Sequence, residues 1–250
     1  MTPEETVAEA GRKIGDLGAL FYFVPATLAR GKELGLDGLR FYVIGRGGVL
    51  GDVEAPVIGS AFGYFSPAFM EKFWSSAKAK VAPRLAARAF TECAAEFGRS
   101  RLRDVDDLEA FCAAAGAVND AADPVGLALY SGTKTEPLAD DLPARAMQLL
   151  NVLREFRGSA HLVAIRAAGL DAKTAHFIRR PADTGMFGWT EADAPVITDA
   201  EVARLGSADE LTDRIVLPAF SVLDEAGRDA LVSGLDRIAA ALAQNRTTNG

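Results

Sequence analysis

The sequence predicts a mainly α-helical fold built from two related halves. Apolar residues recur at helical spacing through most of the 250 residues, glycine and proline interrupt these runs, and one short pattern occurs twice in the same order. The composition fits a folded domain, because 49% of the residues are hydrophobic and 24% are charged.

The first half, residues 1–103, is predicted to be a succession of helices. The turn Gly35-Leu36-Asp37 ends one helix and starts the next, because Gly35 can adopt the left-handed conformation and Asp37 is a good N-cap. Pro67 and Pro83 lie near the starts of two later helices. The expected helices cover residues 4–20, 25–34, 38–44, 53–63, 67–80 and 82–97.

An acidic connector, residues 104–142, is predicted between the halves, with one helix over 105–115. Glycine and proline break the rest of it. The second half, residues 143–244, is predicted to be helical and to end in a tail, 245–250. Its last helix has one apolar face, as either a packing helix or a dimer helix would. The expected helices cover residues 143–156, 159–168, 171–178, 190–195, 198–205, 208–222 and 224–243.

The turn sequence Gly35-Leu36-Asp37 recurs as Gly169-Leu170-Asp171. Further matches follow both copies in the same order with slowly growing offsets, which predicts an internal duplication. A ligand cleft between the halves is then expected, because pockets favour domain interfaces. The matching pairs are Ile44 with Ile178, Arg46 with Arg180, Leu50-Gly51 with Phe187-Gly188, Ala55-Pro56-Val57-Ile58 with Ala194-Pro195-Val196-Ile197, and Pro67-Ala68-Phe69 with Pro218-Ala219-Phe220.

Residues 159–180 are predicted to form a helix-turn-helix unit, because a helix, the Gly169 turn and a second helix follow one another. Residues 154–180 hold six basic and two acidic residues, which suits attraction to phosphates in a chain of net charge −7. The alternative is a pair of packed helices joined by a tight turn. In the DNA-binding interpretation, the contacting residues are Lys173, Thr174, His176, Arg179 and Arg180.

A second set of residues is predicted to line a small-molecule site. Tyr22 and Trp189 offer aromatic walls, and Arg46 and Arg157 suit a carboxylate or phosphate. His161 can act as an acid or base there, or it can be a hydrogen-bonded packing residue. No metal site is predicted, because no His or Cys has a partner at metal-ligand spacing, and the sequence names no cofactor.

Several short motifs occur in a fixed order over about residues 10–240. They are Tyr22-Phe23-Val24-Pro25, Gly45-Arg46, Leu50-Gly51, the run from Leu153 to His161, Ala167-Ala168-Gly169-Leu170, Gly188-Trp189-Thr190 and Leu211-Thr212-Asp213-Arg214. With them, the chain resembles a family of bacterial helix-turn-helix-domain proteins of largely unknown activity, related to MarR-like winged-helix proteins. The resemblance implies a duplicated fold with a degenerate winged-helix-like unit in each half. Residues 191–206, which include Pro195, are too short for a full wing.

These observations predict a helix-turn-helix protein that binds a small molecule and acts as a transcriptional regulator, with double-stranded DNA as a partner and a homodimer as its assembly. The alternative is a small-molecule-binding protein or an enzyme on a degenerate duplicated frame, with its site between the halves. We expect a soluble, cytoplasmic protein without a membrane partner, because no apolar run approaches the ~20 residues of a membrane span and the acidic N-terminus is not a secretory signal.

Overall fold

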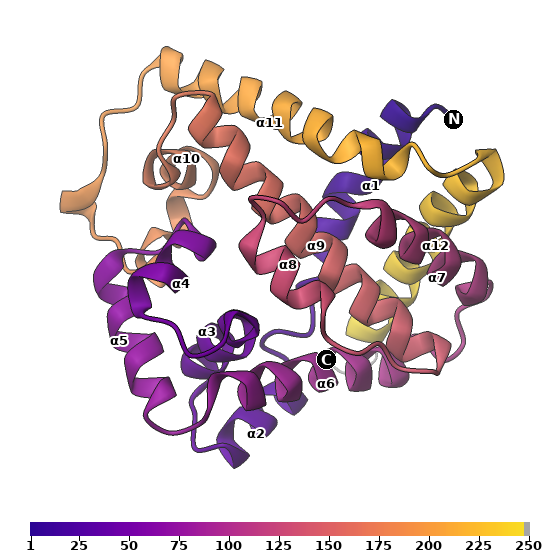
Figure 1. Ribbon diagram of the computed structural model, residues 1–250, viewed down its shortest axis with the longest axis horizontal. Coiled ribbons are helices and arrows are strands. Elements are labelled where there is room, and N and C mark those ends of the chain that lie inside the picture. Colours follow the sequence, from indigo (N-terminus) through magenta and orange to yellow (C-terminus); the bar gives the residue numbers. More distant parts are fainter. Residues whose placement is uncertain (248–250) are drawn as a thin grey trace.

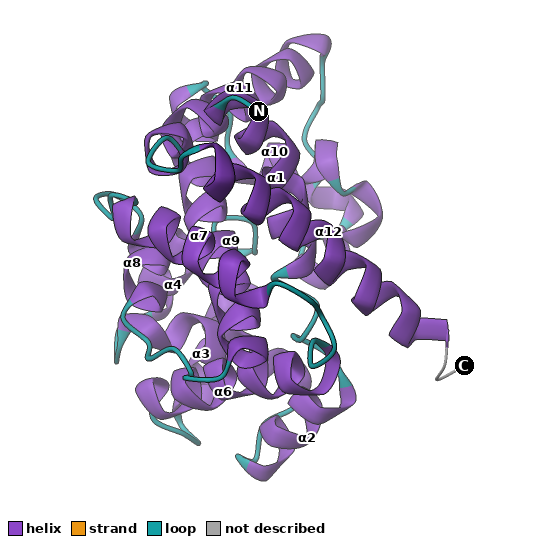
Figure 2. Cartoon of the chain, turned by 90° about the vertical axis from the view of Figure 1, so that its right-hand side faces the viewer, coloured by secondary structure: helices purple, strands orange, loops and turns teal. Residues whose placement is uncertain are grey.

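The computed structural model describes residues 1–247, and within that range the chain forms helices and loops without a strand (Figures 1 and 2). The prediction of a mainly α fold is therefore confirmed. Short 3-10 helices lie at η1 (Gly48–Leu50), η2 (Pro181–Phe187) and η3 (Glu191–Asp193). The α-helices are α1 (Pro3–Leu17), α2 (Pro25–Glu33), α3 (Gly38–Gly47), α4 (Ala55–Phe62), α5 (Pro67–Lys78), α6 (Pro83–Arg101), α7 (Leu108–Ala121), α8 (Ala128–Lys134), α9 (Leu142–Ala167), α10 (Ala172–Arg179), α11 (Asp199–Phe220) and α12 (Glu225–Thr247).

Helix α9 runs through the middle of the molecule (Figure 1). It packs against α1, α6, α7, α8, α10 and α11. The Asp141 side chain caps its N-terminus by accepting a hydrogen bond from the Ala144 amide at 3.2 Å, and Pro143 lies in its first turn. Every residue from Met147 to Leu153 is buried, so this part of α9 is enclosed on all sides, as a helix without an exposed polar face should be.

Residues 104–142, predicted to be an acidic connector with one helix, contain the helices α7 and α8. Helix α7 packs against α9, α11 and α12, and α8 packs against α9. Phe111 of α7 and Tyr130 of α8 are fully buried, whereas almost all carboxylates of the segment are exposed. The acidic composition therefore describes only the outer faces of these helices. The main core draws on residues from Val7 to Leu242 and continues across the predicted boundaries.

Two glycines that the sequence predicts to be helix breaks lie inside helices. Helix α9 continues through Gly158, and α11 continues through Gly206. A glycine inside a helix costs only about 1 kcal/mol relative to alanine, and the buried neighbours Phe156 and Ala160 secure α9 on both sides of Gly158. The predicted pairs 143–156 with 159–168 and 198–205 with 208–222 are therefore single helices.

The two copies of the Gly-Leu-Asp turn have the same backbone geometry. Gly35 and Gly169 both have φ of 74°, the left-handed conformation that glycine adopts without steric cost. After each glycine, the leucine amide donates to the carbonyl five residues earlier at 2.9 Å, which closes the preceding helix. Leu36 is 3% exposed and Leu170 is 2% exposed, so both leucines anchor their turns in the interior.

The equivalence of the two halves does not extend far beyond these turns. Pro56 lies in the first turn of α4, but its predicted counterpart Pro195 lies in an extended segment. Pro67 begins α5, whereas Pro218 lies inside α11. The residues after Trp189, where the family pattern places a wing, form η3 and extended chain rather than a hairpin.

The apolar face of α12 packs inside the chain's own core. Leu231, Leu235, Ile238 and Leu242 are all buried there, which supports the packing interpretation of this face over the dimer interpretation. Residues 245–247 of the predicted tail are helical, and 248–250 lie outside the described residues. Among the described residues, no helix has the length and apolar character that crossing a membrane requires.

Candidate ligand-binding cavity

A cavity of about 310 Å³ is enclosed by residues of α1, α3, α4, α9, α10 and α11. Arg46, Arg157 and His161, which the sequence predicts to bind a ligand, all line it. Arg46 comes from α3 and the other two from α9, so both halves of the chain contribute. Much of the remaining wall is aromatic, from Tyr42, Phe62, Tyr64, Phe65 and Phe187.

Arginine dominates the charged lining of the cavity. Six arginines line it, against two aspartates, Asp16 and Asp209. Two further carboxylates, Glu155 and Asp213, pair with lining arginines from behind the wall. The lining arginines are Arg12, Arg46, Arg154, Arg157, Arg179 and Arg180.

Arg46 is held by a buried carboxylate. Its Nε and Nη2 atoms donate to the two oxygens of Glu155 at 2.7 and 2.8 Å, the bidentate geometry that suits an arginine–carboxylate pair. Its Nη1 atom donates to the Tyr42 hydroxyl at 2.9 Å, and its guanidinium lies 4.4 Å from the centre of the Phe62 ring. Arg46 is therefore fixed before any ligand arrives.

Glu155 also binds a second, partly buried arginine of this wall. The Arg154 Nη1 atom donates to Glu155 at 2.9 Å, and the Tyr22 hydroxyl donates to it at 3.2 Å. Burial acts to raise the pKa of Glu155, but the two arginines outweigh it and hold this pKa well below its usual range. Tyr22 thus supports the wall from behind and does not line the cavity, and burial raises its own pKa.

The ring of His161 is fixed in one tautomer. Its Nδ1 atom lies 2.9 Å from the Thr212 hydroxyl oxygen, which lies 2.7 Å from the Ala208 carbonyl. A carbonyl only accepts, so the single hydroxyl proton of Thr212 goes to Ala208, and Nδ1 must donate to Thr212. This leaves a lone pair on Nε2. The Nε2 atom has no hydrogen-bond partner in the described chain, and it is not fully buried.

His161 is neutral near pH 7. Burial lowers its pKa to about 4, and the nearby Arg179 and Arg157 act in the same direction. Asp209, whose Oδ1 atom lies 3.8 Å from Nδ1, opposes these effects only in part. His161 therefore presents a neutral hydrogen-bond acceptor in a cavity whose charged lining is mainly arginine.

Arg157 fits against the backbone of α1 because residue 11 is glycine. A Cβ on Gly11 would lie 2.6 Å from the Arg157 Nε atom, which is buried without a partner. The Nη2 atom of Arg157 donates to Asp213 at 2.7 Å. The close approach of α1 thus holds this guanidinium in place while part of it faces the cavity.

Trp189 lies outside the cavity lining and supports it indirectly. Its Nε1 atom donates to the Tyr64 carbonyl at 2.8 Å. Tyr64 lines the cavity, and burial raises its pKa to about 12. The structure thus brings Arg46, Arg157 and His161 to one cavity and places Tyr22 and Trp189 behind its wall.

Two of the five predicted DNA-contacting residues are buried. His176 is 4% exposed, and its ring packs against Phe187 with centroids 4.1 Å apart. Thr174 is buried as well, and its hydroxyl donates to the N-cap Asp171 at 2.7 Å. Neither side chain can reach a base edge from this position, because α10 packs against α9, α11 and η2.

The three other residues predicted to contact DNA differ in accessibility. The Lys173 ammonium donates to the Asp193 carbonyl at 3.0 Å and lies 5.5 Å from the centre of the Trp189 ring. Arg179 is exposed and pairs with Asp209 at 2.5 Å. Arg180 is exposed, and its guanidinium has no ion pair within the described residues.

Residues that sequence reasoning did not select as site residues include Arg154, Glu155, Tyr42 and Tyr64. A sequence signal for the first two exists, because the charged pair Arg154-Glu155 lies between the apolar residues Leu153 and Phe156. Buried charges require partners. Their partner Arg46 lies 109 residues away, and no local pattern connects the two segments.

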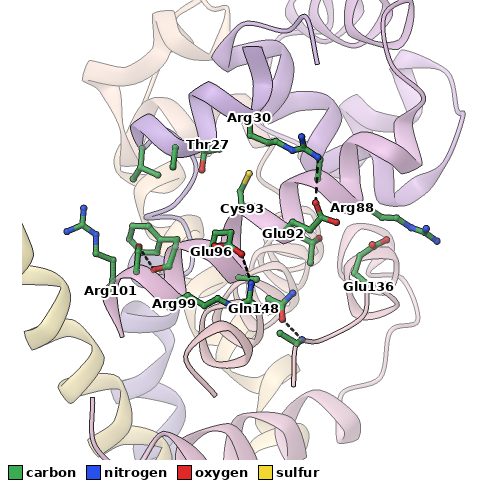
Figure 3. A pocket seen from close by; sticks show the side chains of 18 of the residues that line it. Thr27, Arg30, Arg88, Glu92, Cys93, Glu96, Arg99, Arg101, Glu136 and Gln148 are labelled. Carbon is green, nitrogen blue, oxygen red and sulfur yellow. Dashed lines mark hydrogen bonds and ion pairs between the residues drawn. The ribbon is translucent and has the colours of Figure 1, made fainter. Parts of the chain in front are cut away.

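A second, larger hollow lies between α2, α6 and residues 136–139, with a volume of about 1020 Å³ (Figure 3). Its charged side chains largely neutralise one another. Arg30 lies 3.8 Å from Glu92, and Arg99 pairs with Glu96 at 2.5 Å (Figure 3). This hollow contains none of the predicted site residues.

Comparison with known proteins gives one match. The model of a family described as the helix-turn-helix family matches residues 7–188, which is most of the chain. No curated protein and no solved structure matches.

Proposed function

Because the chain belongs to the helix-turn-helix family, we propose that it is a regulatory protein that binds a small anionic molecule in the arginine-lined cavity. The observation that carries this proposal is the meeting of Arg46, Arg157 and His161 at that cavity. Its arginines outnumber all the carboxylates that pair with them or share the lining. Prearranged cations of this kind favour an anion, since little ordering remains to be done on binding.

Thermal denaturation with a panel of small carboxylates and phosphate esters tests this function. A ligand at about a hundred times its Kd stabilises the folded state by about 2.7 kcal/mol, which corresponds to a rise in Tm of about 5–10 °C for a chain of this size. Arg157→Gln should abolish the rise. The matched control is Arg101→Gln, which removes the same charge from the other hollow and should keep the rise. If no anion raises Tm, the proposed function is wrong.

DNA binding is a second proposed function, supported by the family match and by the position of Arg179 and Arg180 at the exposed end of α10. With Thr174 and His176 buried, the contacts open to α10 are mainly to phosphates, which position a protein without reading sequence. A mobility-shift assay with DNA from upstream of the gene tests this at low and physiological salt. Lys173→Ala and Arg180→Ala should each weaken binding and flatten its salt dependence. Unchanged binding in both variants would exclude α10 as the DNA-binding element.

The same assay separates the regulator from the alternative, a binding protein or enzyme on a degenerate helix-turn-helix frame. A shift that survives physiological salt and responds to a cavity ligand supports the regulator. No shift, together with ligand binding, supports the alternative. The homodimer remains a proposal, tested by light scattering of the purified protein, and reading two half-sites would require about 34 Å between paired α10 helices.

We also propose that the two halves arose by duplication, in line with the family resemblance. The matching geometry of the Gly35 and Gly169 turns supports this. A relation to MarR-like winged-helix proteins would require that the wing has been lost, because the described residues form no strand.

A further inference from the structure

We propose that the cavity recognises the hydrogen phosphate dianion, HPO4²⁻, with the arginines neutralising its charge and His161 Nε2 accepting its hydrogen. This inference rests on the proposed anion-binding function and names the anion. It follows from three features of the lining: the balance of charges, the directions from which the donors come, and the neutral acceptor that His161 adds to them.

The charge balance fits a dianion. Six arginines line the cavity. Four carboxylates lie in the lining or pair with those arginines, namely Asp16, Asp209, Glu155 and Asp213. With His161 neutral, two positive charges are left over. A phosphoryl group carries a charge of about −1.5 to −2 near pH 7, and the hydrogen phosphate dianion has this charge while it still carries a proton. A simple carboxylate would leave one arginine charge uncompensated.

The free donors come from three separate helices. Arg12 of α1 and Arg180, at the end of α10, make no side-chain hydrogen bond or ion pair within the described chain, and Arg157 of α9 uses one Nη atom for Asp213. A planar carboxylate is satisfied by a single bidentate arginine. Donors approaching from several directions suit the three terminal oxygens of a phosphoryl group instead.

The Nε2 atom of His161 distinguishes oxyanions that carry a proton from those that do not. The Thr212 hydroxyl fixes the tautomer of His161, so the lone pair on Nε2 is available to the cavity. An oxyanion without a proton would place an oxygen against this lone pair and lose a hydrogen bond. The hydrogen phosphate dianion carries a proton near pH 7, whereas sulfate, phosphodiesters and the dianion of a phosphate monoester carry none. The same feature argues against the DNA backbone as the occupant of the cavity.

The volume leaves room for an organic group beside the phosphoryl group. A cavity of about 310 Å³ lies at the small end of the range that holds drug-sized molecules. Phe62 and Phe65 supply apolar wall, and their rings contact each other with centroids 5.7 Å apart. A small phosphate monoester would gain contact with this wall, but its dianion has no hydrogen for His161 Nε2, so we expect it to bind more weakly than hydrogen phosphate.

Isothermal titration calorimetry at pH 7 and constant ionic strength, with inorganic phosphate, sulfate and phenyl phosphate, tests the inference. Phosphate should bind at least about tenfold more tightly than sulfate, since a hydrogen bond involving a charged group is at stake. Phenyl phosphate, whose dianion carries no proton, should bind about tenfold more weakly than phosphate. Phenyl phosphate binding at least as tightly as phosphate would overturn the proton requirement.

His161→Phe should reduce the affinity for phosphate to that for sulfate and leave the affinity for sulfate unchanged. Thr212→Val keeps the imidazole but releases its tautomer, so it should reduce the preference for phosphate in part; it also provides a second variant if His161→Phe does not fold. Retention of the preference in a folded His161→Phe protein, checked by circular dichroism, would overturn the inference.

The outcomes separate this inference from the function on which it rests. Equal binding of phosphate and sulfate, both weakened by Arg157→Gln, would overturn the proton requirement and keep the anion site. Binding of a carboxylate without phosphate would overturn the phosphoryl class alone. Only the failure of every anion, in calorimetry and in thermal denaturation, would overturn the proposed function as well.

Discussion

Glu155→Gln removes the carboxylate that lies between Arg46 and Arg154. Glu155 is 1% exposed at its side chain and Arg46 is 12% exposed, and the carboxylate accepts hydrogen bonds from both arginines and from Tyr22. Glutamine retains one acceptor oxygen but presents an amide donor where another acceptor is needed. Breaking a buried ion pair by removing one partner costs about 3–5 kcal/mol, because the remaining charge is left uncompensated.

Urea denaturation of the wild-type and Glu155→Gln proteins measures this cost as a difference in the free energy of unfolding. A loss of about 3–5 kcal/mol in the free energy of unfolding corresponds to a fall in Tm of about 6–20 °C. The matched control is Glu96→Gln, which breaks the exposed pair with Arg99 and should cost less than about 1 kcal/mol. Equal losses for the two substitutions would refute the view that Glu155 organises the cavity wall.

The pH dependence of stability gives an independent check on Glu155. Its pKa is lowered in the folded protein from 4.5 to about 2, so the unfolded chain binds a proton first as the pH falls. The stabilising contribution is therefore fully present above about pH 4.5 and is lost as the pH falls towards 2. Glu155→Gln should lack this part of the acid transition.

Three further predictions concern other parts of the structure. Gly11→Ala should lower the affinity for anions about tenfold, because its Cβ would lie 2.6 Å from the Nε atom of Arg157, whereas Gly116→Ala on α7, outside the cavity lining and with nothing within 4 Å of its Cβ, should keep the affinity and stabilise α7 by up to about 1 kcal/mol; calorimetry and thermal denaturation measure both effects. The pKa of His161 is lowered by burial from 6.5 to about 4, so the unfolded chain binds the proton first and stability should fall by about 2–3 kcal/mol between pH 6.5 and 4; a His161→Phe protein with the same pH profile as the wild type would contradict this assignment. Gly35→Ala and Gly169→Ala should each cost about 1–2 kcal/mol, because both glycines have φ of 74°, and a large difference between the two in urea denaturation would show that the turns are not equivalent.

Local sequence signals predicted most of the helices because the signals that end helices are local. Asp37 and Asp171 cap the helices that follow them, each accepting a hydrogen bond from the amide three residues on at 2.9 Å. Whether a helix continues through a glycine is not decided locally, because it depends on packing from other segments. The sequence around Gly158 permits a break, and only the neighbours of α9 in space keep this helix whole.

In the candidate site, too, some features follow from the local sequence and others depend on packing between distant segments. Arg46, Arg157 and His161 were predicted because arginine suits an anion and histidine can act as an acid or base, and all three line the cavity. Their partners could not be predicted from spacing, because Thr212 and Asp213 belong to a helix more than 50 residues away along the chain. The burial of His176 likewise depends on Phe187 folding back over α10.

The cavity extends beyond the part of the chain that defines the family. Thr212, which sets the tautomer of His161, lies after residue 188, where the family match ends, as do Asp209 and Asp213. The family match therefore carries no information about the groups that hold His161 and Arg157 in place. Two proteins that match the family model equally well can differ in their ligand, and α11 is the element to compare first when a ligand is assigned from one member to another.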